Sequence, residues 1–190
     1  MNEFMLWFST GLQHILDLKA YDHILYIVCL SLLFRLSDWK KLLILVTAFT
    51  LGHSLTLALS VFDLVTIPAS WIEIAIALTI AVTCLINFRE LAINQASIQA
   101  RYWTALLFGC IHGLGFSFLL KAMLGKEESV LFPLFSFNLG LEIGQIAVLV
   151  VVQAFTYFIH HFAIQFEKII LSTITFVILL VSIYLILGRI

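Results

Sequence analysis

The sequence predicts an all-α integral membrane protein, with about six transmembrane helices in one bundle and a short interfacial helix at the N-terminus. Two observations support this fold class. Of the 190 residues, 63% are hydrophobic and 11% are charged, and the mean hydropathy of +1.13 lies far outside the range of soluble domains. Polar residues also gather in short segments between apolar runs of about 20 residues, the length that crosses a bilayer. We therefore expect one helical domain, residues 1–190, embedded in a lipid bilayer.

The segment from Glu3 to Asp17 predicts the interfacial helix. It combines apolar residues with Gln13, His14 and Asp17, and it is both too short and too polar to cross a bilayer. An interfacial or partly inserted helix fits this composition. Trp7 would then lie at the level of the lipid headgroups, where tryptophan is enriched.

Six apolar runs follow and predict the transmembrane helices. Their expected bounds are 21–34, 42–62, 70–88, 102–123, 130–162 and 168–187. The polar stretch 89–101 is expected to form a loop or a surface helix. The fifth run is too long for a straight crossing, so we expect it to tilt strongly or to bend near Gly140 and Gly144.

The positions of Lys and Arg predict the orientation, because short cytoplasmic loops are enriched in these residues. Six of them fall on one side of the predicted bundle and four on the other. The six are Arg35, Lys40, Lys41, Arg89, Arg101 and Lys168, and the four are Lys19, Lys121, Lys126 and Arg189. We therefore expect a multi-pass protein of the bacterial inner membrane with its N-terminus outside. No basic stretch suggests binding to nucleic acid.

Histidine and carboxylate residues occur inside five of the predicted transmembrane helices. Such groups are costly in hydrocarbon and mark functional sites. At a helix rise of about 1.5 Å per residue, they fall in one layer in the outer half of the bundle. The residues are Asp22, His23, His53, Glu73, His112 and Glu142, with His14 beside them on the N-terminal helix. A single histidine of this kind would more often pack between helices, but the shared layer favours one common site.

Imidazole nitrogen and carboxylate oxygen are the ligands that nickel, cobalt, zinc and copper(II) prefer. We therefore expect the residues of this layer to bind a divalent transition-metal ion. Ser54, Asn138 and Gln145 are expected to hydrogen-bond to the ligands from outside. Glycines such as Gly140 and Gly144 would let a neighbouring helix approach closely.

Five segments, in order along nearly the whole chain, resemble the HupE/UreJ family of small bacterial membrane proteins, and in particular its second, less characterised branch. They are His14-Ile15 with Tyr21 to Leu25, Phe49 to Leu57, Glu73 to Ala75, Phe108 to Phe116, and Phe137 to Gln145. Several members of the family are regarded as nickel or cobalt permeases. The resemblance thus implies a helical membrane protein that handles a divalent metal ion.

Two functions remain open from the sequence. In a permease, His14, Asp22 and His23 would collect the ion, Glu73 would line its way in, and three further ligands would hold it. Those three are His53, His112 and Glu142. In the alternative, a zinc-dependent intramembrane hydrolase, the same cluster would bind a catalytic zinc ion and leave one position open for water.

The sequence contains no ATP-binding motif, so transport would use the ion gradient, the membrane potential or a separate partner. Besides the bilayer and the ion, the partners we expect are a second copy of the chain or a metal-delivery protein. His160 and His161 end the fifth apolar run on the predicted cytoplasmic side. They would either lie at the membrane boundary or form a release site.

Overall fold

The computed structural model describes residues 2–18, 21–93, 97–124 and 130–189, and within these ranges every regular element is helical. Five of the described helices are long and apolar enough to cross a membrane. They are α3 (Trp39–Val61), α4 (Ala69–Ile93), α5 (Ile98–Leu124), α6 (Leu131–Phe162) and α7 (Glu167–Leu187). The helical fold class is therefore confirmed. Lys19 and Lys126, which contributed to the predicted orientation, lie outside the described residues.

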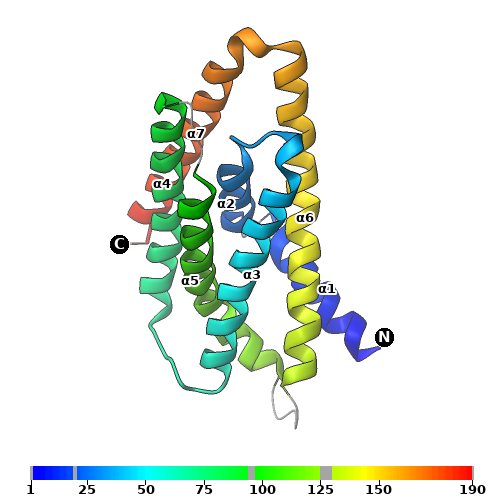
Figure 1. Ribbon diagram of the computed structural model, residues 1–190. Coiled ribbons are helices and arrows are strands. Elements are labelled where there is room, and N and C mark those ends of the chain that lie inside the picture. The colour runs from blue at the N-terminus through cyan, green and yellow to red at the C-terminus, as the bar shows by residue number, and fades with distance from the viewer. Residues whose placement is uncertain (1, 19–20, 94–96, 125–129, 190) are drawn as a thin grey trace.

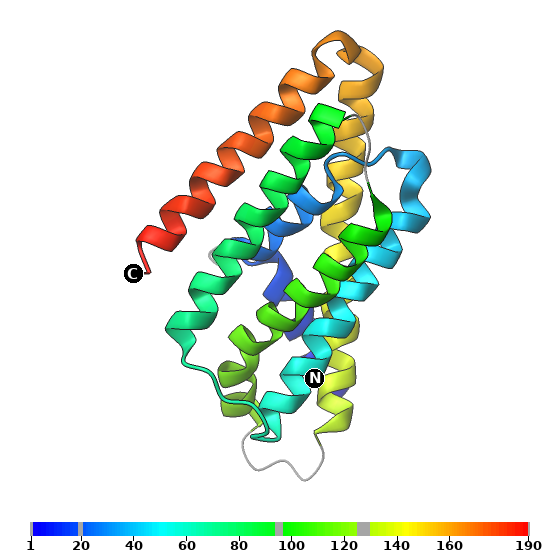
Figure 2. The ribbon, with the colours of Figure 1, turned by 60° about the vertical axis from the view of Figure 1, so that its left-hand side comes forward.

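Two short helices precede the long ones. α1 (Glu3–Leu16) has 14 residues and α2 (Asp22–Ser31) has 10. The first predicted span is thus shorter than expected, because ten residues at about 1.5 Å each extend only half-way across a hydrocarbon core. α1 and α2 follow one another along the length of the bundle (Figures 1 and 2). Together they have the form of an interrupted membrane helix.

Helix α1 packs directly along the first half of α6. A Cβ atom at Gly11 would overlap the carbonyl oxygen of Phe137, and one at Gly140 would overlap that of Phe8. These two glycines therefore set the close approach of the helices. Trp7 is only 2% exposed and packs in the bundle interior. Trp7 therefore faces protein and not lipid, because the close contact turns this face of α1 toward α6; its depth at the headgroups stays a prediction.

A second glycine contact joins α3 to α5. A Cβ atom at Gly52 would overlap the carbonyl oxygen of Leu106, and one at Gly109 would overlap that of Phe49. The hydroxyl of Thr56 also donates to the carbonyl of Cys110 across this interface, at 2.7 Å. The contact brings the middle of α3 against the middle of α5, where each helix carries a histidine.

The C-terminus of α2 ends inside the bundle. A helix leaves its last carbonyls without backbone donors, and the membrane interior supplies no water to replace them. Side chains from three other helices donate to these carbonyls, and the backbone N–H of Phe34 also donates to that of Ser31 at 3.1 Å. The bonds are Asn87 Nδ2 to Cys29 O (2.8 Å), Arg101 Nη1 to Leu30 O (2.9 Å) and Gln153 Nε2 to Ser31 O (3.1 Å).

Most of the described residues of the polar stretch 89–101 are helical. Helix α4 continues to Ile93 and α5 begins at Ile98. Glu90 (6% exposed) and Arg101 (1% exposed) consequently lie inside the bundle, where the guanidinium donates to the Glu90 carboxylate. Arg101 is therefore a buried structural cation, because its charge is neutralised within the protein.

Candidate metal centre

Four histidines from four helices converge in the bundle. His14 comes from the last turn of α1, His23 from the first turn of α2, and His53 and His112 from the middle of α3 and α5. The ring centroid of His23 lies 4.5 Å from that of His14 and 4.8 Å from that of His112. The centroids of His14 and His53 are 5.9 Å apart. The structure thus brings together the four histidines that the sequence predicts as ligands.

These histidines have buried nitrogens without a hydrogen-bond partner among the described residues. They are His14 Nε2, His23 Nε2, His53 Nδ1, His53 Nε2 and His112 Nδ1. An unpaired buried polar atom costs about 1–3 kcal/mol, so several in one place need an explanation. A bound cation would accept the lone pairs and remove this cost.

The hydrogen bonds behind the rings fix which nitrogen is free. His23 Nδ1 lies 3.0 Å from Asp22 Oδ1, and a carboxylate only accepts, so Nδ1 carries the proton and the Nε2 lone pair faces the cluster. The Thr79 hydroxyl donates to the carbonyl of Ile76 at 2.6 Å. Its oxygen therefore accepts from His112 Nε2 at 3.2 Å. The lone pair of His112 is then on Nδ1, the unpaired atom.

The spacing of the nitrogens is suitable for one ion. One ligand atom each from His14, His23 and His53 all lie within 4.8 Å of one another. Nitrogens bound to one tetrahedral zinc at 2.0–2.1 Å are about 3.4 Å apart. Side-chain rotations that move each of these three nitrogens by about 1 Å would therefore bring them to that separation, while His112 lies outside this group of three. Neutral imidazoles suit nickel, cobalt, zinc and copper alike.

Phenylalanine rings enclose the cluster. Phe116 lies 4.1 Å from the ring centroid of His14, and Phe49 and Phe137 lie 6.3 Å and 6.4 Å from those of His23 and His53. These side chains exclude water from most of the site. In such surroundings the attraction between a cation and its ligands is stronger than in water.

A cavity of about 570 Å³ opens beside His14, between α1 and α5. We call it the α1–α5 cavity. Its lining residues are Thr10, Gln13, His14, Leu16, Asp17, Phe116 and Leu119. Because His14 belongs both to this cavity and to the cluster, the cavity reaches the edge of the histidine cluster.

The predicted carboxylates other than Asp22 lie away from the cluster. Glu142 accepts a hydrogen bond from the Thr47 hydroxyl at 2.7 Å, and the exposed Glu73 lies 3.6 Å from Arg189 Nε. Gly140 directs its face of α6 toward α1. Glu142, two residues later, points about 200° away around the helix and therefore faces α3 instead.

The three expected outer partners bond to groups other than the histidines. Their bonds are Ser54 Oγ to Thr50 O (2.7 Å), Asn138 Nδ2 to Leu134 O (2.8 Å), and Thr50 Oγ1 to Gln145 Oε1 (2.8 Å). The partner of His112 is Thr79, which the sequence analysis missed. A membrane threonine usually bonds only to its own helix, so the sequence carried no signal for this second contact.

Asp22→Asn is expected to lower the affinity for nickel about 10- to 100-fold, the usual loss when the partner of a ligating histidine is removed. The substituted amide still offers an oxygen to His23 but no negative charge. Titration of the purified protein with nickel against a chromogenic chelator measures the change. Asp63→Asn is the matched control, since Asp63 is exposed and bonds to Lys121. Equal affinities for the two variants would contradict the role given to Asp22.

A family model described as HupE / UreJ protein matches residues 1–189, almost the entire chain. No curated protein and no solved structure matches the chain.

Proposed function

The chain belongs to the HupE/UreJ family of membrane proteins, and from this premise we propose that it is a permease for a divalent transition-metal ion such as nickel, cobalt, zinc or copper. The observation that carries the proposal is the group of unpaired histidine nitrogens inside the bundle. The ligands of the ion would be His14, His23, His53 and His112. Family members regarded as nickel or cobalt permeases support the same function.

In this proposal the protein transports the ion and does not retain it as a cofactor. It enters through the α1–α5 cavity, meets His14 first, and passes to His23 and His53. Two of these ligands lie at facing ends of short helices, His14 near the end of α1 and His23 at the start of α2. Movement of either short helix would separate ligands that one ion needs together, as in transporters with interrupted helices.

Release would also be favoured by protons, which compete with the metal for the histidine lone pairs. In the orientation proposed from the Lys and Arg positions, the N-terminus is outside the inner membrane of a bacterium. The α1–α5 cavity would then receive the ion from the outer side. Glu73 and Glu142 would not contact the ion in the resting arrangement.

Liposome uptake across a panel of divalent ions tests the proposal. The wild-type chain is expected to give saturable uptake of at least one ion, and His53→Ala should abolish it. His53 is fully buried in the cluster, so its loss should lower affinity by more than the roughly 10- to 100-fold expected for an outer partner. His161→Ala is the matched control, because His161 is exposed at the end of α6.

Two results would count against the permease. Unchanged nickel binding by His53→Ala would refute the shared histidine site. One zinc ion that survives chelation, together with no uptake of any ion, would instead support the zinc-dependent hydrolase.

A further inference from the structure

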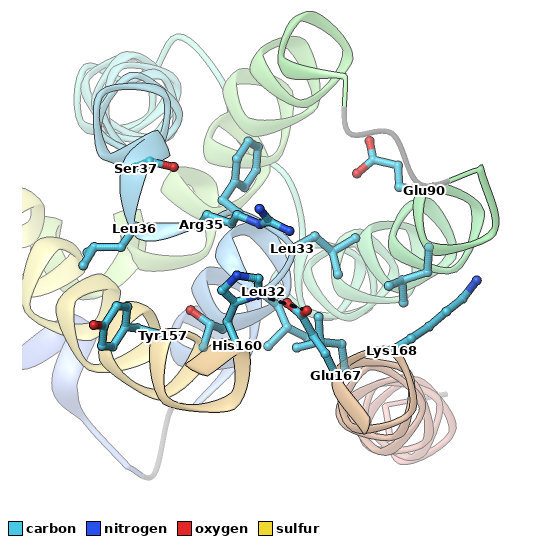
Figure 3. Close-up of a pocket in the computed structure, with 14 residues that line it drawn as sticks. Leu32, Leu33, Arg35, Leu36, Ser37, Glu90, Tyr157, His160, Glu167 and Lys168 are labelled. Atoms are coloured by element: carbon cyan, nitrogen blue, oxygen red, sulfur yellow. Dashed lines mark hydrogen bonds and ion pairs between the residues drawn. The ribbon is translucent and has the colours of Figure 1, made fainter. Parts of the chain in front are cut away.

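A second cavity, of about 880 Å³, lies at the end of the bundle where α6 turns into α7 (Figure 3). We call it the α6–α7 cavity. The ends of α2 and α4, the turn before the short 3-10 helix η1 (Leu36–Asp38), and both sides of the α6–α7 turn contribute to it. Its charged or ionisable lining residues are Arg35, Glu90, Tyr157, His160, Glu167 and Lys168.

One pair in this cavity has the chemistry and the spacing of metal ligands. His160 Nδ1 and Glu167 Oε2 are 3.1 Å apart, and both side chains are partly accessible, at 34% and 27%. Two atoms bound at about 2.1 Å and at a right angle on one ion are about 3.0 Å apart. His160 Nδ1–H donates to the Glu167 carboxylate in this arrangement, so an ion would bind by displacing that proton. The two atoms already have the separation of a chelating nitrogen and oxygen, and the open cavity leaves room for water ligands.

A buried polar face of α4 connects this cavity with the histidine cluster. Its residues recur at helical spacing and are Thr79, Thr83, Asn87 and Glu90, all 6% exposed or less. Thr79 contacts His112 at one end, and Glu90 lines the α6–α7 cavity at the other. Eleven residues at about 1.5 Å each make this face about 16 Å long. Asn87 and Glu90 on this face both accept hydrogen bonds from Arg101, so the face fixes the separation of the two sites.

We propose that the α6–α7 cavity is a second, weaker binding site for the transported divalent ion, with His160 and Glu167 as its protein ligands. This rests on the proposed permease function, and it adds the position from which the ion leaves. Two ligands hold an ion less tightly than four. Arg35 in the lining also repels a cation, whereas the Lys168 side chain extends away from the pair (Figure 3). Low affinity is what release requires.

The test is a nickel titration of the full chain carrying His53→Ala, which removes the strong site. A residual site of lower affinity is expected. Adding His160→Ala and Glu167→Gln should abolish it, whereas adding His161→Ala, one residue away, should leave it unchanged. Glu167→Gln alone keeps a hydrogen-bond acceptor for His160, so it should weaken the residual site without lowering the thermal unfolding temperature.

Absence of the residual site in His53→Ala, or its persistence after both ligands are replaced, would overturn the proposal. A drop in the unfolding temperature for Glu167→Gln with unchanged nickel affinity would also overturn it, because the pair would then only fix the α6–α7 turn. Failure of the permease itself has a different signature. In that case the wild-type chain would lack the strong site that depends on His53.

Discussion

Arg101→Met is expected to destabilise the protein by about 3–5 kcal/mol, the usual cost of removing one member of a buried ion pair. The substitution leaves the Glu90 carboxylate buried without its cation, and it also removes the donor to the last turn of α2 at Leu30. Unfolding in mixed detergent micelles, followed by far-UV circular dichroism, measures the loss.

Two comparisons separate this effect from a general loss of charge. Lys121→Met breaks the ion pair with the exposed Asp63 and should cost only about 0–1 kcal/mol. Combining Arg101→Met with Glu90→Met should recover part of the stability, because no charge is then left unpaired. If Arg101→Met were no more harmful than Lys121→Met, the buried network would have little structural importance.

Gly140→Ala is expected to lower both the stability and the affinity for nickel. Helix propensity alone predicts the opposite, since alanine is favoured over glycine by about 1 kcal/mol. The new Cβ atom would overlap the carbonyl oxygen of Phe8, and overpacking of this kind costs about 1–3 kcal/mol. Helix α1 must then move away from α6, and His14 moves with it.

Gly188→Ala is the matched control, because a Cβ atom there meets only ordinary contacts, the nearest 3.4 Å from Tyr184 O. Unfolding of both variants measures the stability, and nickel titration measures the affinity. A stabilised Gly140→Ala with unchanged nickel affinity would show that the close contact of α1 and α6 does not hold His14.

Hydropathy predicted the helical class and most of the long helices, because a bilayer requires long apolar runs whatever their neighbours. It could not predict that α1 and α2 follow one another as an interrupted helix. That arrangement depends on the contacts of Gly11 with Phe137 and of Gly140 with Phe8, which join residues far apart in the sequence. The burial of Arg101 could not be predicted either, because it also depends on tertiary contacts. A polar stretch between apolar runs is by itself typical of a loop.

The sequence could predict how deep in the bundle the candidate site residues lie, but not the direction in which their side chains point. Counting residues from the helix ends put His53 and His112 in one layer, and the structure brings both into the histidine cluster. Glu142 lies at a similar depth by the same count. Which way it points depends on which face of α6 meets α1, and this is decided by tertiary packing. The sequence alone therefore could not separate Glu142 from the four histidines.

The side chains that complete the end of α2 also constrain how the protein is made. Asn87, Arg101 and Gln153 are synthesised well after α2 leaves the ribosome. Until they arrive, the carbonyls of Cys29 and Leu30 lack these side-chain donors in the hydrocarbon, and ten residues are too short to remain across the bilayer unaided. Helix α2 thus takes its final position only after α6 has been translated, and only then does His23 reach the other histidines.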